Sequence, residues 1–183
     1  MALSHAIMTA LLDEELSGYD LTRRFETSLG FFWESSHQQI YRELRQLSER
    51  GWLQATPVVQ DGRPDKILYA LTEDGRKALA EWVQGPTNLK RAKDDLFVKL
   101  YNIGHCDPAP VLAEIRRRQE QHAARLALYE KIRQRHYAVP EQLSAHRKGI
   151  YLALAAGIRH ERMYLDWCDE ALTLLKDVAS AEP

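Results

Sequence analysis

The clearest alternation of apolar and polar positions in this chain lies in residues 35–53. At 3.6 residues per turn, the apolar positions here fall on one narrow stripe formed by Ile40, Leu44 and Leu47. Ser35 or Ser36 can cap the first amides of such a helix, and Gly51 can supply the left-handed turn after it. The opposite side is polar and carries Gln38, Arg42, Arg45 and Glu49, flanked by His37, Tyr41 and Gln39.

Two shorter helices are predicted before this one. Residues 2–13 place apolar side chains at helical spacing, namely Leu3, Ile7, Ala10 and Leu11. A second helix is expected to begin at Ser17, because the hydroxyl of Ser17 and the carboxylate of Asp20 have the spacing of a capping box. Its buried stripe is Leu21, Phe25 and Leu29, and Gly30 ends or bends it. Three short helices of this kind form a core in which the third is free to enter a groove of DNA.

After the third helix the hydrophobic period changes from 3.6 to 2. Residues 52–60 and 67–71 are rich in β-branched and aromatic residues, and residues 61–65 have strong turn chemistry. This pattern predicts a two-stranded hairpin with Arg63 and Lys66 at its tip. Pro57 is acceptable there only if its strand lies at an edge of the sheet.

A fourth helix is predicted to follow the hairpin. Thr72 can cap it, and Gly85 with the proline after it ends it. Leu79, Trp82 and Val83 are expected to face inward. The order of three helices, a hairpin and a helix is that of a winged helix-turn-helix, in which the third helix lies in the major groove and the hairpin tip reaches the flanking backbone.

The polar front of the third helix suits DNA recognition, since glutamine and arginine match the paired hydrogen-bonding groups of adenine and guanine. The alternative is an ordinary amphipathic helix with a solvated face. The basic hairpin tip in the same hundred residues favours DNA. The predicted base readers are Gln38, Gln39 and Arg42, with His37 beside them. The predicted phosphate contacts are Tyr19, Ser36, Tyr41 and Arg45, with Arg63 and Lys66 on the wing.

Five segments resemble, in order and spacing, the PadR family of bacterial transcriptional regulators. They are LSGYDL at 16–21, SLGFFW at 28–33, QIYRELRQLSERGWL at 39–53, GRP at 62–64 and YALTEDGRKAL at 69–79. The resemblance implies a dimeric repressor with an N-terminal winged helix and a C-terminal helical dimerisation region, responsive to phenolic or other aromatic and cationic compounds. Many members have proline after the Ile-Tyr pair where this chain has Arg42, so the operator sequence cannot be transferred from relatives.

The second half of the chain is predicted to be almost entirely helical, with breaks at 104–110 and around Pro140. In the last helix, apolar residues recur in alternating steps of three and four: Tyr151, Leu154, Ile158, Leu165, Cys168, Leu172 and Leu175. Glu161 is the single polar interruption of this seam. Burying each such side chain stabilises by about 1.5–3 kcal/mol, so the row must be covered.

We expect the chain's own helices to cover part of this seam and a second copy to cover the remainder, giving a two-fold homodimer. Two reading helices about 34–36 Å apart would then recognise a palindromic operator in double-stranded DNA. The predicted fold is therefore mainly α with a small β-hairpin. Residues 1–85 are expected to form the winged helix-turn-helix, and residues 86–183 an antiparallel helical region for dimerisation and effector binding.

Aromatic side chains supply candidates for a pocket that binds a small aromatic effector. They are Trp33, Trp52, Tyr101, Tyr164 and Trp167. Ordinary core packing is the competing explanation for each of them. The residues alone therefore assign no ligand.

Composition narrows the remaining classes of function. A net charge of −1 argues against indiscriminate coating of nucleic acid but permits a locally basic surface. No apolar run approaches membrane-spanning length and no signal-peptide pattern is present, so we expect a cytoplasmic protein without a membrane partner. Cys106 and Cys168 lack zinc spacing, and no phosphate loop or nucleophile motif appears. We therefore expect no metal, no cofactor and no enzymatic activity. A helical protein-interaction module and a ligand sensor that does not bind DNA are the competing interpretations.

Overall fold

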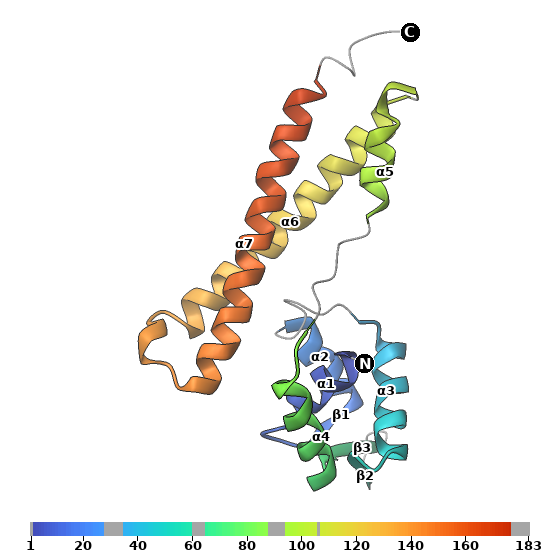
Figure 1. Ribbon diagram of the computed structural model, residues 1–183, viewed down its shortest axis with the longest axis vertical. Coiled ribbons are helices and arrows are strands. Elements are labelled where there is room, and N and C mark those ends of the chain that lie inside the picture. Colours follow the sequence, from blue (N-terminus) through green and yellow to red (C-terminus); the bar gives the residue numbers. More distant parts are fainter. Residues whose placement is uncertain (1, 28–34, 60–64, 88–93, 106, 177–183) are drawn as a thin grey trace. The chain divides into compact units, whose positions relative to one another are not determined.

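The computed structural model describes residues 2–27, 35–59, 65–87, 94–105 and 107–176. The chain divides into two compact units, residues 1–89 and 90–183 (Figure 1), each of which is described by itself. Two predicted site residues, Trp33 and Arg63, lie outside the described residues. None of the described helices is both long and apolar enough to cross a membrane.

The first unit has the predicted order of three helices, a hairpin and a helix, with one additional short strand before the second helix. It contains α1 (Ala2–Ala10), β1 (Leu16–Ser17), α2 (Gly18–Thr27), α3 (His37–Glu49), β2 (Leu53–Val58), β3 (Lys66–Leu71) and α4 (Glu73–Gln84). The first helix ends three residues earlier than expected, at Ala10 rather than Asp13. The guanidinium of Arg24 satisfies this end of the helix, because its Nη1 donates to the carbonyl of Ala10 at 3.0 Å while Nη2 pairs with Glu14.

The sheet has three strands instead of the predicted two. Their order is β1-β3-β2, and all pairs are antiparallel. The additional strand is the residue pair Leu16–Ser17, which lies opposite Tyr69 and Leu68. A strand of two residues is too short to display alternation, so only its pairing with a segment fifty residues away reveals it. Pro57 lies in β2, which is an edge strand as predicted.

The core of this unit confirms the predicted stripe of α3, whose Ile40, Leu44 and Leu47 are all buried. They pack with apolar residues of the other helices and strands, including Ile7, Met8, Leu11, Leu21, Phe25 and Leu79. The expectation for the rest of α4 was wrong, since Val83 is exposed and Trp82 lies at the surface, stacked on His5 at a centroid distance of 4.3 Å. Only one face of α4 meets the core, and Leu79 occupies it.

The second unit consists of helices. They are α5 (Asp95–Tyr101), the short 3-10 turn η2 (Ile103–His105), α6 (Ala109–His136), a second 3-10 turn η3 (Pro140–Gln142) and α7 (Ala145–Leu174). The breaks between them fall where glycine and proline predicted them. The two long helices run back along each other in Figure 1.

The predicted seam of α7 is covered in part by the unit's own helices. Leu154, Ile158 and Cys168 are buried, and Cys168 belongs to a cluster with Leu96 of α5 and Ile115 of α6. These three positions therefore need no second copy to remove them from water. Three apolar residues of α7 that the seam did not include are exposed, namely Leu152, Met163 and Leu174.

The polar interruption of the seam has its own partners. Glu161 is buried at 2% exposure, and its Oε2 lies against Nδ1 of His122 on α6, while Arg125 approaches Oε1 at 3.7 Å. A buried carboxylate requires partners of this kind because its desolvation is costly. The pair therefore links α6 to α7 across their interface.

Candidate DNA-binding surface

Helix α3 presents the polar front that its sequence predicts. Ser36 is its N-cap, and the Gly51 backbone after it has φ +72°, in the left-handed region. The side chains of Gln38, Arg42 and Arg45 are exposed on the side away from the buried stripe. One face of α3 is therefore buried in the core, and the opposite face is exposed to solvent.

Gln39, predicted to read a base, also has a structural role at the start of α3. Its Oε1 accepts a hydrogen bond from the backbone N–H of Ser36 at 2.9 Å, and the hydroxyl of Ser36 accepts one from the backbone N–H of Gln39 at 3.3 Å. This reciprocal capping box holds the first turn of α3. The amide oxygen of Gln39 is therefore occupied within the chain.

The cations on this front are not neutralised by neighbours. In the described part of the chain, neither Arg42 nor Arg45 forms an ion pair, whereas Arg24 on α2 is paired with Glu14. The acidic side chain of Glu43 turns toward α1, where it accepts a hydrogen bond from the hydroxyl of Ser4 at 2.9 Å. Glu49 is the exposed acidic residue at the end of the helix. The middle of α3 is consequently a positively charged surface.

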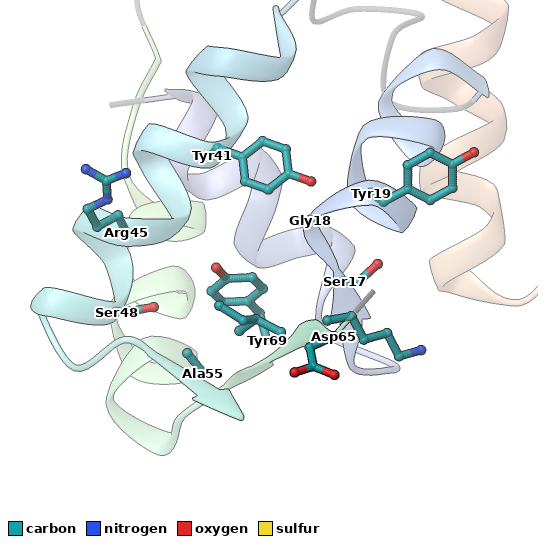
Figure 2. Close-up of a pocket in the computed structure, with 11 residues that line it drawn as sticks. Ser17, Gly18, Tyr19, Tyr41, Arg45, Ser48, Ala55, Asp65 and Tyr69 are labelled. Carbon is teal, nitrogen blue, oxygen red and sulfur yellow. The ribbon is translucent and has the colours of Figure 1, made fainter. Parts of the chain in front are cut away.

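A groove lies between α3, the start of α2 and the sheet (Figure 2). We call it the α3–sheet groove; it has a volume of about 610 Å³ and is lined by Ser17, Gly18, Tyr19, Tyr41, Arg45, Ser48, Ala55, Asp65, Lys66, Ile67 and Tyr69. Three tyrosines give it an aromatic wall, and two cations against the single carboxylate of Asp65 leave it with a net positive charge. This combination suits an anionic ligand with a flat or extended shape.

The groove brings together four residues that were predicted separately from the sequence. Tyr19 comes from α2, Tyr41 and Arg45 from α3, and Lys66 from the start of β3. Tyr69 completes the lining and was not predicted as a site residue. Its alternation with Ile67 and Leu71 is the available signal in the sequence, but this alternation indicates only a strand.

Close packing against Gly18 sets the position of Tyr41. A Cβ atom at residue 18 would lie 2.5 Å from Cε1 of Tyr41, so only glycine leaves room for the ring where it is. Figure 2 shows the Tyr41 ring extending from α3 toward the start of α2. Gly18 therefore decides where the Tyr41 hydroxyl lies in the groove.

The candidate effector residues are only partly brought together. Tyr164 stacks on His122 with a centroid distance of 4.4 Å, and the Trp167 ring lies 6.1 Å from Tyr164 and 5.5 Å from Phe97. Tyr101 does not join this row and is 91% exposed at the end of α5. The remaining candidate, Trp52, lies in the first unit, half-buried below the guanidinium of Arg50.

The described residues form no comparable site for metal binding. Among the described residues, no three His, Cys, Asp or Glu side chains come together as a potential metal site. Cys168 is buried, and burial raises the pKa of its thiol. The α3–sheet groove is therefore the site with the most specific chemistry.

Two family models match the chain, one in each half. Residues 7–81 match the transcriptional regulator PadR-like family, and residues 92–176 match the C-terminal region of the virulence activator alpha family. A probable transcriptional regulator of Mycobacterium tuberculosis is 38% identical over 187 residues, covering 97% of this chain and 99% of the relative. The negative transcriptional regulator PadR of Bacillus subtilis is 30% identical over 178 residues, covering 94% and 97%.

Solved structures are similar over nearly the whole chain. PadR of Bacillus subtilis in complex with operator DNA has a TM-score of 0.78 at 27% identity and covers 96% of this chain and 99% of its own. The same protein in complex with p-coumaric acid has a TM-score of 0.72 at 28% identity, with the same coverage. The virulence activator AphA of Vibrio cholerae has a TM-score of 0.78 at 31% identity, covering 97% and 99%.

Proposed function

This chain belongs to the PadR family of transcriptional regulators, and we propose that it binds a specific DNA sequence through α3 and the neighbouring groove. The observation that carries the proposal is the set of cations without intramolecular partners on one surface: Arg42, Arg45 and Lys66 in the described part of the chain. Unpaired arginines beside an exposed glutamine are the groups that read base edges and neutralise phosphates.

The residues divide into two roles by their place on α3. Recognition helices contact bases mainly through their N-terminal half, so Gln38 and Arg42 read base edges, with His37 beside them. Tyr19, Tyr41 and Arg45 line the groove and hold phosphates, and Ser36 offers its hydroxyl at the helix start. Lys66, at the start of β3, holds the DNA backbone beside the groove.

The regulator acts as a homodimer on a palindromic operator in the cytoplasm of a bacterium. Two copies related by a two-fold axis place two α3 helices one DNA turn apart, about 34–36 Å. The exposed apolar residues of α7 and the half-buried part of its seam, Tyr151, Leu165, Leu172 and Leu175, supply the dimer contact. Occupation of the operator blocks transcription, so the regulator is a repressor.

A small aromatic compound relieves this repression in our proposal. Support comes from the complex of Bacillus subtilis PadR with p-coumaric acid. Within the second unit, Tyr164 stacks on His122 and meets Trp167 edge-on, and this group of rings suits an aromatic ligand. Burial raises the pKa of the Tyr164 hydroxyl, which therefore remains a hydrogen-bond donor at neutral pH.

Binding to duplex DNA as a function of salt tests the proposed function. The full chain is first used to select a duplex from a random pool, and its mass in solution is determined in parallel. We expect a dimer, a palindromic consensus, and a linear fall of log affinity with log salt concentration. A monomer, or no retention on any duplex at low salt, would refute the proposal and favour a protein-interaction module or a ligand sensor.

Gly18→Ala should weaken DNA binding without unfolding the chain. The new methyl group displaces the Tyr41 ring from the groove, and the loss of one phosphate contact weakens binding by about tenfold. The change is measured by fluorescence anisotropy with labelled duplex, and thermal unfolding is followed by circular dichroism. Gly149→Ala on α7 is the matched control, because a Cβ there meets nothing within 4 Å. Equal affinities for both variants would contradict the role given to Gly18.

Lys66→Ala should weaken binding to all sequences alike. A phosphate contact carries no sequence information, so affinity for the selected duplex and for a random duplex should fall by a similar factor of about three to ten. The slope of log affinity against log salt should decrease by about one. A preserved slope would remove Lys66 from the phosphate contacts.

A further inference from the structure

The hydroxyl groups that line the α3–sheet groove differ in whether they are already engaged. Ser17 Oγ donates to Oδ2 of Asp20 at 2.6 Å and accepts from the Asp20 backbone N–H at 3.1 Å. Ser48 Oγ donates to the carbonyl of Leu44 at 2.9 Å. Within the part of the chain that the structure describes, the hydroxyls of Tyr41 and Tyr69 make no hydrogen bond. Among the described serine and tyrosine hydroxyls of the groove, the free donors are therefore phenols and not serines.

Tyr69 is held more firmly than the other tyrosines of the groove. It lies on the central strand, opposite Leu16 of β1 on one side and Ala55 of β2 on the other. Figure 2 shows its ring rising from β3 toward α3, with the hydroxyl below Tyr41. Tyr19, in contrast, is 62% exposed on the first turn of α2. A donor on a paired central strand is already positioned before any ligand binds.

The Tyr69 hydroxyl also keeps its proton. Burial raises the pKa of Tyr69, the neighbouring Tyr41 raises it further, and Arg45 acts in the opposite direction. At neutral pH the group is consequently a neutral donor with a cation nearby. A donor next to a guanidinium is an arrangement that suits an anionic oxygen.

We propose that the α3–sheet groove binds one phosphate of the DNA backbone and that Tyr69 is a further DNA-contacting residue, which donates a hydrogen bond to this phosphate. This inference rests on the proposed function, because it places a strand of the same duplex in the groove. Arg45 supplies the charge that neutralises the phosphate, and Tyr41 covers it from α3. A phosphate is favoured over a base because Arg45 lies in the C-terminal half of the recognition helix, away from the base-reading residues.

Tyr69→Phe tests the donor while keeping the ring and its packing. We expect affinity to fall by about tenfold for the selected duplex and for a random duplex alike. The slope of log affinity against log salt should stay unchanged, because a neutral donor releases no counterion. Arg45→Gln should instead lower that slope by about one. Tyr101→Phe, on an exposed tyrosine of the second unit, is the control and should bind like the wild type.

A methylphosphonate scan then identifies the phosphate. Each backbone phosphate of the selected duplex is replaced in turn by a neutral methylphosphonate, and affinity is compared for wild type and Tyr69→Phe. At one phosphate per half-site, the methylphosphonate should lower the affinity of the wild type. It should have little further effect on Tyr69→Phe, which already lacks the hydrogen bond to that phosphate. For each protein, the affinity for a modified duplex is divided by the affinity of the same protein for the unmodified duplex. A smaller fraction of active protein in the variant preparation therefore does not change the result.

Two results would overturn the inference alone. One is wild-type affinity in Tyr69→Phe, and the other is a scan in which both proteins lose the same factor at every phosphate. If the wild type binds no duplex at all, the proposed function fails together with the inference. The wild-type titration is measured first and separates a failure of the proposed function from the two results that concern Tyr69 alone.

Discussion

Arg42→Ala is expected to lower affinity for the operator by about 1–3 kcal/mol and to relax the sequence preference at a single base position. Arg42 is exposed on the polar front of α3, and in the described part of the chain no carboxylate holds it. Its guanidinium can therefore donate two parallel hydrogen bonds to O6 and N7 of a guanine. Losing these two hydrogen bonds lowers the affinity and also removes the preference for guanine at that position.

The measurement is a repeated selection from a random duplex pool with the variant, followed by titration of all four bases at the affected position. Affinity for random duplex should change much less than affinity for the operator, whereas Lys66→Ala is expected to lower both affinities by a similar factor. Arg116→Ala, an exposed arginine on α6, controls for the loss of one positive charge. An unchanged consensus would remove Arg42 from the base readers.

His122→Phe is expected to lower the free energy of unfolding by about 3 kcal/mol, because it leaves a buried carboxylate without its nearest partner. Glu161 is almost completely buried, and of its two basic neighbours His122 is the closer. Phenylalanine keeps the stacking on Tyr164 but offers no hydrogen bond. Urea denaturation followed by circular dichroism measures the change.

The double variant His122→Phe with Glu161→Leu separates this cause from a packing defect. When both polar groups become apolar, no buried charge remains, and stability should return to within about 1 kcal/mol of the wild type or exceed it. His160→Phe, an exposed histidine on α7, should be close to neutral. If the double variant is as unstable as the single one, His122 stabilises the fold through the packing of its ring and not through its pairing with Glu161.

The local features of the first unit were predictable because they depend on residues close together in sequence. The cap residues Ser36 and Thr72 each accept a hydrogen bond from the backbone N–H three residues later. The turn after α3 needs only the glycine at position 51. The buried stripe of α3 follows from helical periodicity alone. These predictions are confirmed.

The errors concern contacts between distant segments. The strand Leu16–Ser17 exists because it pairs with β3, and Tyr69 becomes a groove residue because the start of α2 and the middle of α3 enclose it. Trp82 satisfied the helical pattern but lies at the surface. Periodicity indicates which residues share a face of a helix or strand, but it does not indicate which other segment, or solvent, contacts that face.

By itself, the sequence determined the order of the helices and of the hairpin, the family and the polar front of the third helix, since propensity, capping and period act over a few residues. The tertiary structure decided which of these residues share a groove, which hydroxyls are free in it, and how much of the α7 seam is covered by α5 and α6. Those outcomes depend on close packing between segments far apart in the chain, and close packing is a property of the folded molecule alone.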